Sequence, residues 1–119
     1  MRKLETIQTQ ANLNRVFAID EIGPGGAYHE YEIKRDDTGE TLATIQLQKG
    51  PRKEPDSIHG VLDVDLLEIV RDRMKAFQAG PFACDYNARA LEGVEAALTA
   101  LNDRVEDRLK RDVLGKNEK

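Results

Sequence analysis

Apolar and polar residues alternate with a period of two between Ala27 and Arg35, which is the pattern of a β-strand with one buried face. One face of this strand carries Ala27, His29, Tyr31 and Ile33, and the other carries Tyr28, Glu30 and Glu32. A segment at 16–22, with apolar Val16, Phe17 and Ile19, precedes it. The Gly-Pro-Gly-Gly segment at 23–26 forms a turn between these two segments, because glycine allows a positive φ angle and the ring of proline fixes the φ angle of that residue. The pattern therefore predicts two strands joined by a turn.

A polar turn at 36–40 follows, and residues 42–49 predict a third, less regular strand. Residues 15–50 are thus expected to form a small antiparallel β-meander. Residues 1–14 are polar with scattered apolar positions, and they predict either a flexible arm or an edge element. Residues 51–62 are rich in residues that break regular structure and carry basic side chains, so we expect a loop there.

The apolar spacing changes to that of a helix after Asp63, which can cap the first turn, and the helix is expected to end at Gly80. A second helix is predicted to begin near Cys84 or Asp85 and to run to about Val113. Its apolar stripe consists of Leu91, Val94, Leu98, Leu101, Val105 and Leu109.

The second helix is expected to be longer than the first, so part of its apolar stripe has no facing helix in the same chain. This favours a homo-oligomer, although a hairpin packed only on its own sheet is the alternative. The predicted fold class is α+β: one domain over 1–119, with a small N-terminal antiparallel β-meander followed by a long antiparallel α-helical hairpin over 63–113.

The charge and the cysteine content of the chain exclude some classes of partner and cellular location. The net charge of −4 and the pI of about 5.2 argue against DNA or RNA as a partner, because binding to phosphate backbones needs a basic surface. The single cysteine cannot form a disulfide within the chain, and neither a signal peptide nor a membrane span is evident, so a cytoplasmic protein is expected.

The sequence contains no recognisable catalytic, metal-binding or cofactor motif. His29 and His59 are the only histidines, and neither has a local acid or base partner. Cys84 precedes a helix but has no base near it in the sequence, so a small structural cysteine is the simpler interpretation. We therefore expect a binding protein without a cofactor, rather than an enzyme.

Two sets of residues suggest a nucleotide site. Phe77 ends the first helix and Asn87 opens the second, so the bend would offer a ring to stack on a base and an amide to read its edge. On the second helix, Arg104, Arg108 and Arg111 share one face and could hold phosphates bidentately, although an ion-paired surface is the alternative. In an antiparallel dimer the arginines of one chain would meet the bend of the other.

The run FQAGPFACDYNARAL followed by NDRVEDR, together with QKGPRKE before it, resembles the helical-hairpin domain of phage anti-defence proteins. The resemblance covers residues from about 15 to 117. It is to the Thoeris anti-defence protein one group, whose N-terminal meander the GPGGAYHEYEI segment also matches, and more distantly to the anti-CBASS protein two group.

This resemblance implies a non-enzymatic sponge in the cytoplasm of the host bacterium. Its ligands would be glycocyclic ADP-ribose made by Thoeris TIR enzymes and cyclic trinucleotides of CBASS, bound by a dimer or by a hexamer built as a trimer of dimers. The alternatives are an enzyme that degrades these signals and a structural hairpin that binds proteins.

The resemblance also implies roles for individual residues. Phe77 would stack on the adenine, Asn87 would hydrogen-bond the ligand, and Arg104 and Arg108 would hold the pyrophosphate. Arg52, with Lys53 beside it, would belong to the cyclic-trinucleotide site. Tyr28 and His29, in the strand after the turn, are further candidates that would roof the pocket in the dimer.

Overall fold

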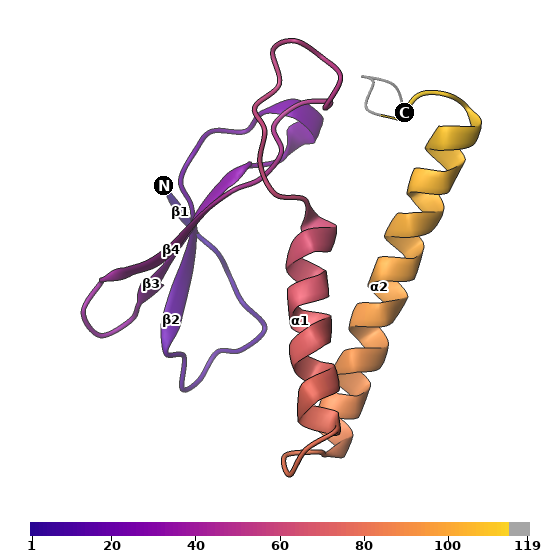
Figure 1. The fold of residues 1–119 in the computed structure, drawn as a ribbon. Coiled ribbons are helices and arrows are strands. Elements are labelled where there is room, and N and C mark those ends of the chain that lie inside the picture. The colour runs from indigo at the N-terminus through magenta and orange to yellow at the C-terminus, as the bar shows by residue number, and fades with distance from the viewer. Residues whose placement is uncertain (115–119) are drawn as a thin grey trace. The chain divides into compact units, whose positions relative to one another are not determined.

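The computed structural model describes residues 1–114, which divide into two compact units, residues 1–61 and residues 62–114 (Figure 1). The first unit is an antiparallel β-sheet and the second is a pair of helices joined by a short bend. The predicted α+β class, with a meander followed by a helical hairpin, is confirmed.

The sheet has four strands in the order β1-β2-β3-β4, and each strand is antiparallel to its neighbour. The strands span Arg2–Lys3 (β1), Asn14–Ala18 (β2), Glu30–Arg35 (β3) and Thr41–Gln46 (β4). The segment predicted as an arm or an edge element thus contributes the edge strand β1.

The register of the sheet confirms the alternation that the sequence predicts. Val16 pairs with Ile33, and Ile33 pairs with Ala43. Two residues further along β2, Ala18 pairs with Tyr31, which pairs with Ile45. Because paired residues share a face, these side chains form one apolar face centred on Ala18, which is fully buried.

Two strands are shorter than predicted. The first was expected at 16–22 but ends at Ala18, because the Asp20 carboxylate takes over the role of a main-chain acceptor. Its oxygens accept hydrogen bonds from the amides of His29, at 3.0 and 3.2 Å, and Glu30, at 3.2 Å. The third strand ends at Gln46, short of the predicted 49.

The loop after β4 is folded back on itself. The amide and carbonyl groups of Lys49 and Ile58 exchange hydrogen bonds of 2.8 and 2.9 Å, and Val61 donates to the Gln46 carbonyl at 2.9 Å. Gly60 lies so close to this backbone that a side chain there would collide with the Gln46 carbonyl. The predicted loop is therefore held at its base and presents its tip, residues 52–56, to solvent.

Asp20 makes the first unit sensitive to acid. Burial raises the pKa of its carboxyl group, but the hydrogen bonds from the His29 and Glu30 amides outweigh burial and place the pKa below its ordinary value. A lowered folded-state pKa stabilises the fold above about pH 4 and loses that contribution as the pH falls further.

We expect the Asp20→Asn variant to be less stable than the wild type at pH 7, because its amide group places a donor against two backbone amides. The difference in melting temperature should shrink as the pH falls from about 5 towards 3. Thermal melts of both proteins across this range measure it, with the neighbouring exposed Glu21→Gln as the control. A difference that is independent of pH would show that the Asp20 charge contributes nothing.

The second unit consists of α1, Asp63–Gln78, and α2, Asp85–Lys110. Leu62, not Asp63 as predicted, is the N-cap of α1, because the carboxylate of Asp65 in the first turn reaches back to accept from the Leu62 amide at 2.8 Å. Cys84 is the N-cap of α2, and its Sγ accepts from the Asn87 amide at 3.4 Å. The helix ends before the predicted Val113.

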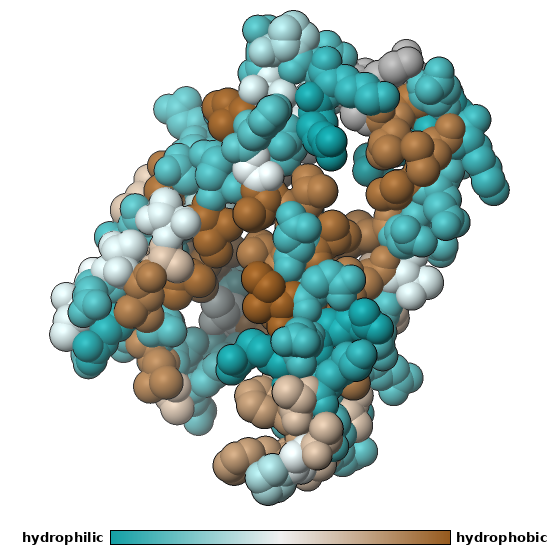
Figure 2. Space-filling model, in the orientation of Figure 1, coloured by the Kyte–Doolittle hydropathy of each residue, from teal (hydrophilic) through white to brown (hydrophobic). Residues whose placement is uncertain are grey.

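The two helices differ in length. At a rise of 1.5 Å per residue, α1 is about 24 Å long and α2 about 39 Å, so the last turns of α2 have no facing partner on α1. Figure 2 shows hydrophobic residues along this C-terminal half of α2, with hydrophilic residues beside them. Leu109, on this extension, is 58% exposed.

Gly93 lies inside the continuous helix α2, where close packing does not require a glycine. A Cβ atom placed there would have no neighbour within 4 Å, and the residue is exposed. We expect Gly93→Ala to stabilise the protein by about 1 kcal/mol, because alanine lowers the conformational entropy lost on helix formation. Chemical denaturation measures the change, and Ala96→Gly, at another exposed position of α2, should cost a similar amount. A destabilised Gly93→Ala variant would mean that another subunit packs against this site.

Candidate functional site

The bend between the helices is fixed by side chains and backbone together. The Gln78 side-chain carbonyl accepts from the Cys84 amide at 3.0 Å, which ties the start of α2 to the end of α1. The Gly80 amide donates to the Phe77 carbonyl at 3.2 Å, which closes the last turn of α1. Phe77 and Asn87 are therefore presented from two helix ends in a fixed arrangement.

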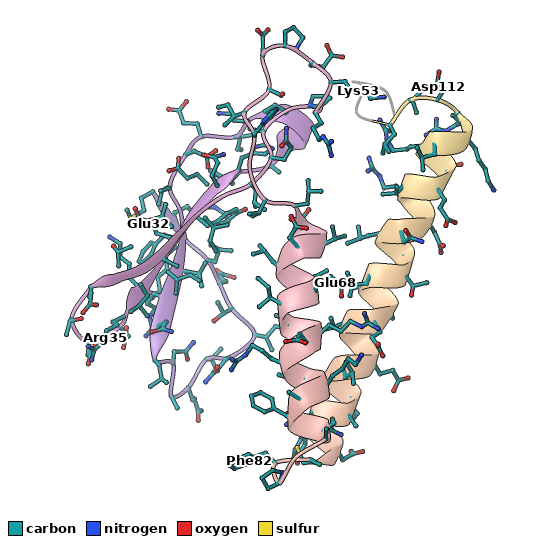
Figure 3. The ribbon with its side chains drawn as sticks, in the orientation of Figure 1. Glu32, Arg35, Lys53, Glu68, Phe82 and Asp112 are labelled. Atoms are coloured by element: carbon teal, nitrogen blue, oxygen red, sulfur yellow. The ribbon has the colours of Figure 1, made fainter. Side chains whose placement is uncertain are left out.

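The side-chain amide of Asn87 uses its nitrogen within the chain and leaves its oxygen as an acceptor. Its Nδ2 group donates to the Phe82 carbonyl at 3.4 Å. Within residues 1–114, no group donates to its Oδ1, and an amide oxygen can accept from the exocyclic amine of a base. The Phe82 ring lies at the bend (Figure 3) and is 74% exposed, so it does not staple the hairpin.

Phe77 is half-buried, and the guanidinium of Arg73 lies over its ring, 5.3 Å from the centroid. The two residues are one turn apart on α1, where side chains at i and i+4 are neighbours. Sequence reasoning missed Arg73. The signal was an arginine four residues before Phe77, with no acidic residue three or four positions away from it on the helix.

The arginines of α2 have different environments. Arg104 is exposed and forms no hydrogen bond or ion pair with any residue of the described part of the chain. Arg108 is only 5% exposed, and its Nη2 donates to the Val113 carbonyl at 2.9 Å. Arg111 pairs with Asp107 at 3.2 Å. The ion-paired surface considered as an alternative therefore describes Arg111 but not Arg104.

These two sets of residues lie at opposite ends of α2. At 1.5 Å per residue, Arg104 lies about 26 Å along the helix from Asn87, and Arg108 about 32 Å. A small cyclic nucleotide cannot bridge that distance. One chain brings Phe77 and Asn87 together, but it does not bring the arginines to them.

The four candidate residues in the first unit differ in how exposed their side chains are. Arg52 and Lys53 are adjacent and exposed, and Lys53 lies on the loop that precedes α1 (Figure 3). Tyr28 is half-buried, with the Arg2 guanidinium 4.7 Å from its ring centroid. His29 is 9% exposed, and its buried Nδ1 has no hydrogen-bond partner among the described residues. As it stands, the His29 ring is packed inside the unit, beside Gly23 and Lys49.

A groove of about 540 Å³ runs between α1 and α2. None of the eight predicted site residues lines it, and its polar centre is the ion pair of Arg71 with Glu95, at 2.9 Å. Hydrogen bonds to Glu95 and Glu68 raise the pKa of Arg71 above its ordinary value. Since two carboxylates already compensate the Arg71 charge, this groove is poorly suited to an anionic ligand.

Other chemistry is not evident in the part of the chain that the structure covers. Within residues 1–114, no three His, Cys, Asp or Glu side chains are arranged to hold a metal ion. None of the helices there is long and apolar enough to cross a membrane. What the second unit does offer is an aromatic ring and an amide oxygen at the bend, and exposed positive charge at the far end of α2.

Comparison with known proteins gives two matches. Residues 40–106 match the Acb2/Tad1 hairpin domain, a stretch that includes Arg52, Phe77, Asn87 and Arg104. The chain is also 38% identical over 97 residues to a protein of Bacillus phage SBSphiJ7 that carries the name Thoeris anti-defense 1. That alignment covers 82% of this chain and 66% of the relative, just under two thirds of its length.

Proposed function

The chain belongs to the Acb2/Tad1 hairpin-domain family, and from this premise we propose that it is a phage anti-defence protein that binds and sequesters nucleotide immune signals. The name of the Bacillus phage relative supports the anti-defence role. The proposed ligand is a glycocyclic ADP-ribose made by a TIR enzyme of a Thoeris system. The protein would act in the cytoplasm of the infected bacterium, where it would keep the signal from its effector.

The observation that carries this proposal is the separation of complementary groups along α2. The bend supplies a ring and an amide acceptor, whereas positive charge without a carboxylate partner lies at Arg104, about 26 Å away. In an antiparallel pair of chains, the extension of one α2 would bring Arg104, and Arg108 one turn further, to the Phe77 and Asn87 of its partner. The exposed apolar residue Leu109 on the same extension supports such pairing.

In the proposed complex, Phe77 stacks on the adenine and Asn87 accepts from its amine. Arg104 holds the pyrophosphate through paired N–H groups, which match the spacing of phosphate oxygens. Arg108 joins it once its guanidinium turns from the Val113 carbonyl. Tyr28 and His29 would roof the pocket, which for His29 requires that its ring leave its present packing.

A second proposed site takes cyclic trinucleotides and uses the exposed pair of cations at Arg52 and Lys53. The assembly is proposed to be a dimer or a hexamer built as a trimer of dimers. Both sites are proposed to bind their ligands without changing them, and neither requires a cofactor.

A capture-and-release assay tests this function. The protein is mixed with glycocyclic ADP-ribose isomers or with cyclic trinucleotides and filtered, and the retained fraction is heated. The expected result is that a ligand disappears from the filtrate and returns intact on heating. A chemically altered ligand would indicate an enzyme, and unchanged filtrates would favour a hairpin that binds proteins.

A further inference from the structure

Arg73 lies in an unusual setting for a surface arginine. Its neighbours one turn away on α1 are Ile69, Val70, Ala76 and Phe77, none of which is acidic. Ile69 is 60% exposed, and Val70 is exposed as well. No carboxylate in residues 1–114 forms an ion pair with Arg73. Its guanidinium instead makes a cation–π contact with the Phe77 ring.

Arg71, two residues earlier, shows what a compensated arginine looks like on the same helix. It bonds Glu95 at 2.9 Å and Glu68 at 3.4 Å, and both carboxylates lie within its reach. Glu68 lies midway along α1 (Figure 3), whereas Arg73 and Phe77 lie in the last two turns of the helix. Uncompensated positive charge beside an aromatic ring is a combination that binds nucleobases, because guanidinium planes and aromatic rings both stack on them.

Arg73 and Phe77 are in direct contact, and a base would fit between them only after the Arg73 side chain moves away from the ring. A planar group that stacks on a base lies about 3.5 Å from it, so two planar groups on opposite faces of one base are about 7 Å apart. The guanidinium carbon of Arg73 is now 5.3 Å from the Phe77 centroid. A small rotation of the exposed Arg73 side chain opens the remaining distance without moving the helix.

We propose that Arg73 is a ligand-binding residue whose guanidinium covers the face of the purine opposite to Phe77. This rests on the proposed function, since it places the stacked base of the same ligand. Arg73 thereby selects for a planar base that carries negative charge elsewhere in the molecule. It also adds a contact from the same chain as the ring, on the side away from the partner's arginines.

The test measures binding of glycocyclic ADP-ribose by calorimetry, together with the NMR shifts of the adenine H2 and H8 protons. Arg73→Ala should weaken binding about tenfold, and Arg73→Lys, which keeps the charge but loses the plane, should recover only part of the loss. Both variants should alter the bound adenine shifts, which a purely structural role of Arg73 would leave unchanged. The control is Arg89→Ala, an exposed arginine near the same bend, with binding expected within about twofold of wild type.

The outcomes separate this inference from the function on which it rests. If Phe77→Ala loses binding while both Arg73 variants bind as wild type with unchanged shifts, Arg73 is only a surface neighbour and the inference is wrong. If Phe77→Ala itself binds normally, the proposed base site is wrong, and so is the role that we assign to Arg73. Lysine has nearly the helix propensity of arginine, so Arg73→Lys remains informative even if the alanine variant folds poorly.

Discussion

Replacing Phe77 with alanine is expected to weaken capture of glycocyclic ADP-ribose by roughly 5- to 150-fold, because a base stacked on an aromatic ring gains about 1–3 kcal/mol. The ring is half-buried, so part of its surface is available to a ligand while the rest is held by the hairpin. Calorimetry of the purified variant measures the loss directly. A thermal melt beside it reports any change in the stability of the hairpin.

The matched control is Phe82→Ala, four residues after the end of α1. This second ring is 74% exposed at the same bend and is not assigned to the ligand, so its removal should change binding by less than about twofold. Phe77→Leu keeps the apolar side chain but loses the aromatic face, and it should bind as weakly as the alanine variant. Tight binding by Phe77→Leu would show that Phe77 fills space in the hairpin and that the base stacks elsewhere.

The hairpin could be predicted well from the sequence because its signals are local. Apolar residues at helical spacing define both helices, and Gly80 with the capping Cys84 marks the bend between them. The error at the start of α1 is also local in origin. Asp63 was expected to cap the helix from its residue type, and only the geometry shows that Asp65, two residues later, reaches the Leu62 amide.

The sheet was harder to predict because its extra strand is not local. β1 contains only Arg2 and Lys3, and nothing in two basic residues indicates a strand. It exists because the exposed edge of β2 accepts it, through pairs such as Lys3 with Phe17. The early end of β2 has a similar cause, since Asp20 bonds the amides of residues nine and ten positions later.

The candidate site illustrates what residue type alone cannot decide. Arg104 and Arg108 occupy the same helix face one turn apart, and the sequence treats them alike. Arg104 is exposed, whereas Arg108 is buried and donates to the Val113 carbonyl just past the end of α2. This difference arises because α2 ends at Lys110, which brings the following backbone within reach of Arg108 but not of Arg104.

Co-expressing two defective variants is expected to restore binding that neither has alone. Arg104→Glu should lower affinity by more than about a hundredfold, since it removes charged hydrogen bonds to phosphate and adds repulsion. Phe77→Ala damages the other end of the proposed site. In the proposed dimer these ends come from different chains, so a mixed dimer would contain one site with both defects and one site with neither.

The mixed assembly can be isolated with a different affinity tag on each variant. Its expected ligand stoichiometry is about half that of the wild type, with wild-type affinity at the restored site, whereas each homo-oligomer binds weakly. A chain that carries both substitutions, co-expressed with wild type, provides the control. It leaves every site of the mixed dimer with one defect, so tight binding there should be absent. If the complementing pair also fails to bind, the bend and the arginines do not meet across two chains, and the separation of about 26 Å along α2 would have to be bridged in another way.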